Sequence, residues 1–301
     1  MGSWGTGLYS GDFASDLRST IRAVVRLPFE PDRLLDIVVS TEPTAALNPE
    51  DDDYSTFWLV VADRFARCGI KADRAVETAL RIIDSGQDLE TQRRLGQTAS
   101  GLEKRRRVLS EVRDRIVNPA TVDTRKTIRK PQPYVMGVGD VLAYPICGGD
   151  CRNPYATRPD QLKIYGPGGG QPWTQDAWAA TIIVERGLTF GFFAWYRPLV
   201  VRAAYDARPT LAELTDAQWA LQLPGTCSAT HFRRIGFEIV GTVPVSHAKL
   251  ETRYPTLQPG TSAAISDISI ANRLKVWSVN RMRPISPALQ ERLVRVGDLI
   301  A

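Results

Sequence analysis

The chain has 301 residues, of which 43% are hydrophobic and 24% are charged, and its formal net charge at pH 7 is +5. This composition is typical of a folded globular protein and excludes a disordered chain. No apolar run reaches the ~18 residues of a membrane-spanning helix, and the four cysteines are too few for a secreted disulfide scaffold.

The start of the chain, MGSWGTGLYSGDF, has no basic segment followed by an apolar stretch, so we expect no secretory signal. We therefore expect a cytoplasmic protein with reduced thiols and no membrane partner. The charge is unevenly spread: residues 1–99 contain 11 Lys/Arg against 16 Asp/Glu, whereas residues 100–133 contain 10 against 4. The basic excess is thus concentrated in one short part of the chain.

Residues 1–117 have the pattern of an α-helical domain. Asp12 is predicted to cap the first helix, and Pro31 suits the first turn of the second. Gly69 and Gly86 are predicted to end two further helices. Apolar residues recur at helical spacing in five stretches, which we expect to be the helices: 12–25, 30–40, 50–70, 71–86 and 100–117.

Residues 118–133, NPATVDTRKTIRKPQP, contain three prolines and no hydrophobic period. A stretch of this composition is typical of a linker, so we place the domain boundary here.

Residues 134–301 are predicted to form a β-rich domain with short helices. The strands alternate apolar and polar residues and are rich in β-branched side chains. We expect a turn near Arg186 and Gly187 between two strands. The fold class is therefore α+β, with an N-terminal α-helical bundle followed by a small, bent antiparallel sheet or barrel. Strands are expected in 134–146, 161–166, 178–201 and 238–245, and short helices in 210–221, 228–235 and 246–254.

The glycine-rich stretch YGPGGGQPW, residues 165–173, is not a phosphate-binding loop, because the Lys-Ser/Thr pair that would follow is missing. It is predicted to be a hairpin loop. The aromatic residues around it are candidates for a contact surface, and a place in the core is an equally good interpretation: Tyr165, Trp173 and Trp178.

Two short pairs of potential metal ligands stand out. Cys147 and Cys151 flank a Gly-Gly turn, and Cys227 and His231 have the same spacing near an expected helix start. Structural zinc sites commonly combine two such pairs into a tetrahedron, so the four residues are a candidate zinc site. Two alternatives stay open: plain buried thiols, and a pair of thiols that forms a redox disulfide.

Cys227 and His231 also suggest a hydrolase, since residues four apart on a helix can meet as nucleophile and base. A third residue would have to orient the imidazole, and none is evident in the sequence. Catalysis is therefore the least favoured interpretation of this pair.

The basic stretch 104–130 is a candidate nucleic-acid interface, because a row of cations can follow a phosphate backbone. A solvated helix face with pairs such as Glu111 and Arg115 is the competing interpretation. The candidate residues are Arg105, Arg106, Arg107, Arg125, Lys126, Arg129 and Lys130.

Two stretches resemble bacterial families. The first is MGSWGTGLYSGDFASDL, in which Trp4, Gly5, Gly7 and Asp12 match the opening of a domain family of unknown function that begins Met-Gly-Ala-Trp-Gly-Thr-Gly. The resemblance covers the first 20 or so residues well and the rest of the helical domain loosely.

The second stretch, VGDVLAYPI, resembles the first strand of a polymorphic-toxin immunity family that begins Gly-Asp-Val-Phe-Ala-Ile-Pro. The matching residues are Gly139, Asp140, Val141, Ala143 and Pro145. Neither family supplies catalytic residues. Together the resemblances imply a non-enzymatic bacterial protein-binding module, an immunity or defence-associated factor whose partner is another protein such as a toxin.

Overall fold

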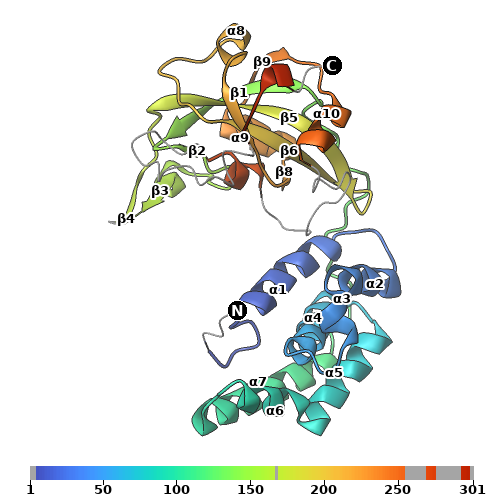
Figure 1. The fold of residues 1–301 in the computed structure, drawn as a ribbon. Coiled ribbons are helices and arrows are strands. Elements are labelled where there is room, and N and C mark those ends of the chain that lie inside the picture. Colours follow the sequence, from blue (N-terminus) through green and yellow to red (C-terminus); the bar gives the residue numbers. More distant parts are fainter. Residues whose placement is uncertain (1–4, 167–168, 255–268, 276–292, 299–301) are drawn as a thin grey trace. The chain divides into compact units, whose positions relative to one another are not determined.

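The computed structural model describes residues 5–166, 169–254, 269–275 and 293–298. The chain divides into two compact units, with the boundary between Lys130 and Pro131. The helices gather in the first unit and an antiparallel sheet forms the second (Figure 1), which confirms the predicted α+β fold class. Within the described ranges, no helix is long and apolar enough to cross a membrane.

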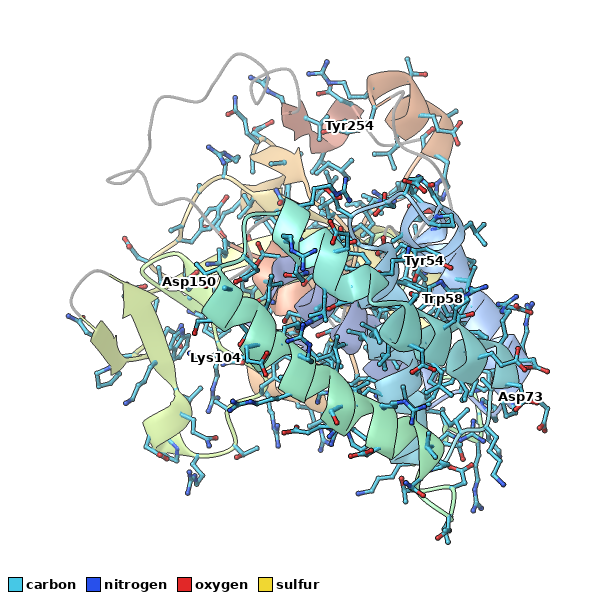
Figure 2. The ribbon with its side chains drawn as sticks, turned by 90° about the horizontal axis from the view of Figure 1, so that it is seen from below. Tyr54, Trp58, Asp73, Lys104, Asp150 and Tyr254 are labelled. Atoms are coloured by element: carbon cyan, nitrogen blue, oxygen red, sulfur yellow. The ribbon has the colours of Figure 1, made fainter. Side chains whose placement is uncertain are left out.

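The first unit is built around α4, which packs against α1, α3, α5, α6 and α7. Phe57 and Phe65 of α4 are almost fully buried, and Tyr54 and Trp58 lie on the same helix in Figure 2. The helices are α1 (Asp12–Val24), α2 (Pro31–Thr41), α3 (Pro43–Leu47), α4 (Tyr54–Cys68), α5 (Asp73–Ser85), α6 (Gln87–Arg94) and α7 (Ala99–Val117).

Single residues in the sequence predicted several of these helix ends correctly. Pro31 opens α2, and Gly69 and Gly86 end α4 and α5 in the left-handed conformation, as predicted. The predicted cap at Asp12 is wrong, because Gly11 is the capping residue and Asp12 is the first residue of α1. Its carboxylate still lies in the first turn, where the helix dipole favours negative charge. Helices α3 and α6 were not predicted, since both are too short to show an apolar period.

A buried carboxylate holds the N-terminal segment against the helices. Asp63 of α4 has no exposed side-chain surface, and it accepts hydrogen bonds from Arg67 Nε at 2.8 Å, Arg115 Nε at 2.7 Å and the hydroxyl of Tyr9. The segment around Tyr9 is the one that carries the first family resemblance, although Trp4 lies outside the described residues.

The segment after α7 packs along the first unit, although the sequence predicted a linker there. Ala120 N donates to Ala66 O at 3.0 Å, and Ile128 N donates to Arg26 O at 2.7 Å. A Cβ on Gly69 would lie 2.4 Å from the carbonyl oxygen of Val122, so this glycine permits the close approach. Backbone hydrogen bonds, which composition does not reveal, thus bind these residues to the helices.

The second unit contains an antiparallel sheet with the strand order β10-β7-β6-β5-β1-β2, in which β8 lies beside β6 and β9 beside β1. A separate hairpin consists of β3 (Lys163–Gly166) and β4 (Gly169–Pro172). The sheet strands are β1 (Asp140–Cys147), β2 (Asp150–Cys151), β5 (Ala177–Thr189), β6 (Phe193–Val201), β7 (Gln218–Leu221), β8 (Gly225–Thr226), β9 (Glu238–Thr242) and β10 (Leu293–Arg295). The short helical elements are η1 (Pro159–Gln161), α8 (Leu211–Leu214), α9 (Ala229–Ile235), α10 (His247–Arg253), η2 (Ile270–Arg273) and η4 (Val296–Asp298).

The turn between β5 and β6 lies later than predicted. Strand β5 continues through Gly187, and the chain turns at Phe190 and Gly191, both with positive φ. Gly187 faces Trp195 across the two strands, and a Cβ on Gly187 would lie 2.5 Å from the indole ring. The glycine therefore makes room for a tryptophan and does not mark a turn.

The core of the second unit contains tyrosines whose hydroxyl groups are hydrogen-bonded to the backbone. Tyr144 is fully buried and donates to the carbonyl oxygen of Leu274 at 2.9 Å. Tyr196 is also buried, and its hydroxyl accepts from Val135 N at 2.8 Å. The contact to Leu274 fixes the segment 269–275, which includes η2, against β1. This segment forms one wall of the site described next.

Candidate functional site

A cavity of about 270 Å³ opens in the second unit beside β2. Strand β2, the loop after it, the β3–β4 hairpin and the segment 269–275 all contribute to its lining (Figure 2 labels Asp150). The lining residues that matter for its chemistry are Asp150, Cys151, Asn153, Tyr155, Lys163 and Lys275.

The tight turn between β1 and β2 brings Asp150 to the cavity. Gly148 and Gly149 both have positive φ, as a two-residue type I′ hairpin requires, and Cys147 pairs with Asp150 across the turn. Asp176 Oδ2 accepts from Gly148 N at 2.8 Å and so holds the turn from outside. The glycine pair of the sequence is thus a hairpin turn.

Asp150 joins the walls of the cavity. Its carboxylate lies 3.3 Å from Lys275 Nζ, and its carbonyl oxygen accepts from Trp173 Nε1 at 3.2 Å. The ion pair reaches the segment 269–275, and the hydrogen bond reaches the residue that follows β4. Trp173, which the sequence placed in either a contact surface or the core, is therefore a wall residue here. The side chain of Tyr165 lies outside the described residues.

A second hollow of about 330 Å³ adjoins the first, and the two share Asn153, Tyr155 and Lys163. The second hollow also includes Asp160 and Gln161. We refer to the two hollows together as the polar groove.

Tyr155 lies where the two hollows of the polar groove meet, and 52% of its surface is exposed. Its ring packs edge-to-face against His231 of α9, with 4.7 Å between the ring centroids. Arg234 of α9 donates to the carbonyl oxygen of Pro154 at 3.0 Å. Helix α9 thus supports the loop that presents Tyr155.

The predicted zinc ligands do not converge in this arrangement. In the β1–β2 ladder Cys151 pairs with Ile146, whereas Cys147 pairs with Asp150. Paired residues share a face of a sheet and successive residues alternate, so Cys147 and Cys151 point to opposite faces.

The other two predicted ligands are a buried core thiol and an imidazole that contacts an aromatic ring. Cys227 is 1% exposed within the core, and His231 packs against Tyr155. Across the part of the chain that the structure describes, no group of three or more His, Cys, Asp or Glu side chains is placed to hold a metal ion. Four ligand atoms would have to come within about 2.0–2.3 Å of one point. Zinc binding by the four residues therefore stays a prediction that metal analysis can test.

The thiols near the cavity are poor nucleophiles. Burial raises the pKa of both Cys151 and Cys227 to about 12, so both are protonated at neutral pH. The thiol of Cys151 donates to the carbonyl oxygen of Ala271 at 3.3 Å. Burial and the charge of Arg234 lower the pKa of His231. This arrangement does not support a Cys227–His231 nucleophile and base.

Arg105, a predicted nucleic-acid contact, is a structural residue. It is 5% exposed, and its guanidinium makes two hydrogen bonds of 2.8 Å to the carboxylate of Asp88. It also donates to the carbonyl oxygen of Gly7 at 2.9 Å. Helix α7 turns this side chain inward, so the structure does not offer Arg105 as a surface cation.

Two of the remaining predicted basic residues are bound to other groups in the described part of the chain, and four are not. Arg106 pairs with Glu103, and Arg125 donates to Asp123 and to the carbonyl oxygen of Phe29. The other four are exposed, with no ion pair to any described residue: Arg107, Lys126, Arg129 and Lys130. The candidate basic surface thus consists of fewer cations than the sequence suggests.

The groove residues Asn153, Tyr155, Gln161 and Lys163 were not singled out from the sequence. The available signal was a polar loop, RNPYATRPDQ, with one aromatic residue between two prolines. No protein-family model, no curated protein and no solved structure matches this chain.

Proposed function

We propose that the chain is a non-enzymatic protein-binding module, and that the second unit holds a segment of a partner protein in the polar groove. The observation that carries this proposal is the pair of adjoining hollows that share a half-exposed Tyr155. Tyrosine is enriched among the residues that dominate the binding energy of protein interfaces, because it combines a large apolar ring with a polar hydroxyl.

The walls of the groove are held in place before binding. The ion pair between Asp150 and Lys275, the hydrogen bond from Trp173 and the contact of Tyr155 with His231 connect four separate parts of the chain. A site that is ordered in advance loses less conformational entropy on binding, so more of the contact energy appears as affinity.

The kind of partner comes from the second family resemblance alone. The residues that carry it, Gly139 to Pro145, lead into β1 and form most of it, and β1 ends at the turn that presents Asp150. A bacterial toxin or another defence component is therefore the partner to test first.

Site-specific photo-crosslinking tests this proposal. The photoreactive residue benzoylphenylalanine replaces Tyr155 in one variant and Ile239 in the control, and the chain is co-expressed with the products of neighbouring genes. Ile239 is 56% exposed on β9 and lines neither hollow. We expect a crosslinked partner from position 155 and none from position 239.

The crosslinked partner is then purified, and its affinity for the unmodified chain is measured. Removal of the ring in Tyr155→Ala should weaken binding by roughly tenfold or more, as is common for a central interface tyrosine. Equal crosslinking from both positions, or an unchanged affinity of the Tyr155→Ala variant, would contradict the proposal.

A further inference from the structure

In the loop that lines the groove, the side-chain amide oxygens of Asn153 and Gln161 accept hydrogen bonds from the backbone of the same loop. Asn153 Oδ1 accepts from Tyr155 N at 3.0 Å, and Gln161 Oε1 accepts from Thr157 N at 2.8 Å and Arg158 N at 3.3 Å. A backbone N–H can only donate, so the oxygen of each amide must face the loop. The NH₂ groups of Asn153 and Gln161 are therefore what these side chains can offer to a ligand.

Two aspartates and two lysines line the groove, and with Arg158 beside it the nearby cations outnumber the carboxylates. Each of its two carboxylates has a cation nearby: Asp150 lies 3.3 Å from Lys275, and Asp160 lies 3.6 Å from Arg158. Lys163 borders both hollows and is exposed, and its ammonium group has no ion pair with any residue in the described ranges. Among the described residues Lys163 is thus a cation without an ion-pair partner, and it adds to the donors that Asn153 and Gln161 present.

From these donors we infer that the polar groove selects an acidic segment of the partner protein. A carboxylate of the segment would meet Lys163, and further oxygen atoms would accept from the NH₂ groups of Asn153 and Gln161. Hydrogen bonds between charged groups are about twice as strong as neutral ones, so Lys163 would dominate this selectivity. The inference rests on the proposed function, because it names the chemistry of the segment held in that same groove.

The two aspartates of the groove favour a peptide over a nucleic acid. A nucleic-acid strand presents a phosphate at every nucleotide, and a continuous row of phosphates along the groove would come close to Asp150 and Asp160. A peptide can place one carboxylate at Lys163 and neutral residues beside the two aspartates. Charge complementarity of this kind determines specificity more than total affinity.

Fluorescence polarisation with the full chain tests the inference. The probes are labelled peptides of equal length with acidic residues, with the matching amides or with lysines at the same positions, together with a labelled mixed-sequence single-stranded DNA. We expect the acidic peptide to bind roughly tenfold more tightly than its amide counterpart, which is the effect of one charge-assisted hydrogen bond.

Two charge reversals control for general attraction between the basic chain and an acidic probe. Lys163→Glu changes the groove, whereas Lys104→Glu makes the same change of net charge at an exposed position of α7 (Figure 2). Lys163→Glu should lower the affinity for the acidic peptide roughly tenfold, Lys163→Arg should retain it and Lys104→Glu should change it less than about twofold.

Each contrary outcome overturns the inference in a recognisable way. Equal binding of the acidic and amide peptides, or no binding of either, excludes selection by charge. Equal losses in Lys163→Glu and Lys104→Glu indicate general attraction, and tighter binding of the DNA assigns the groove to nucleic acid. If position 155 still crosslinks to a partner protein, the proposed function stands while the inference fails. If position 155 crosslinks to none, the proposed function itself fails.

Discussion

The Arg105–Asp88 pair of the first unit and the polar groove of the second both contain charged side chains, but these are buried and paired in the first and more exposed in the second. Arg105 and Asp88 are 5% and 1% exposed, and they satisfy one another with two hydrogen bonds. In the groove, Lys163 is exposed and the amides of Asn153 and Gln161 use only their oxygens. Charge that is paired and buried maintains the fold, whereas unused donors on the exposed loop and on Lys163 of β3 are available for binding.

The largest expected effect is the loss of one member of the buried pair. Arg105→Met keeps much of the side-chain volume but leaves Asp88 buried without its cation, which should cost about 3–5 kcal/mol of unfolding free energy. Urea denaturation followed by far-UV circular dichroism measures this. Arg107→Met, on the exposed side of the same helix, should stay within about 0.5 kcal/mol of the wild type.

Removing both partners sharpens this prediction. The double variant Arg105→Met with Asp88→Leu has no buried charge, and it should recover much of the stability that Arg105→Met loses. If the double variant is as unstable as the sum of the two single variants, the pair does not act as a unit.

The opposite result is expected in the groove. Lys163→Glu and Tyr155→Ala should each lower the affinity for a bound segment by roughly tenfold, equivalent to about 1.4 kcal/mol. Lys163→Glu should leave the unfolding free energy within about 0.5 kcal/mol of the wild type, because its side chain is exposed. Tyr155→Ala also removes the ring contact with His231, so it should cost about 0.5–1.5 kcal/mol of unfolding free energy. Parallel titrations and denaturation curves on the same preparations check both halves. A loss of stability in Lys163→Glu that matches its loss of affinity would place Lys163 with the structural residues.

The buried carboxylate Asp63 predicts a dependence of stability on pH. Burial raises its pKa, but the hydrogen bonds from Arg67, Tyr9 and Arg115 outweigh burial and lower it. A folded-state pKa below the unfolded value of about 3.9 gives stability that is present above that value and is lost as the pH falls through the folded pKa. The urea midpoint should therefore fall between pH 5 and pH 3, and it should fall less steeply in Asp63→Asn. An identical slope in the two proteins would contradict the role of Asp63.

The smallest effect is expected from removal of metal. In the described arrangement Cys147 and Cys151 face opposite ways, and Cys227 is buried in the core. Treatment with a chelator should thus leave the melting temperature of the purified protein unchanged. Stoichiometric zinc by elemental analysis, with a large drop in melting temperature after chelation, would support the predicted site and require the β1–β2 hairpin to be rearranged.

The sequence predicted the features that depend on neighbouring residues. Pro31, Gly69 and Gly86 mark helix ends through the conformation of a single residue, and the apolar periods place the longer helices. The turn predicted near Gly187 was wrong, because the sequence does not distinguish a glycine that makes room for a tryptophan ring from one that forms a turn.

The candidate site depended on distant contacts and could be predicted only in part. The opposite orientation of Cys147 and Cys151 follows from strand register, which spacing alone does not give. The cavity wall requires the segment 269–275 to meet β2, more than 100 residues earlier in the chain, through the ion pair of Lys275 with Asp150. The inward turn of Arg105 among three consecutive arginines likewise depends on Asp88 of α6.

The most direct test of the binding role is the photo-crosslinking comparison of positions 155 and 239. A partner protein that crosslinks from position 155 only, and that binds the Tyr155→Ala variant roughly tenfold more weakly, is the predicted result. Crosslinking that is equal at the two positions, or absent at position 155 while the chain still binds its partner, would contradict a role for the polar groove.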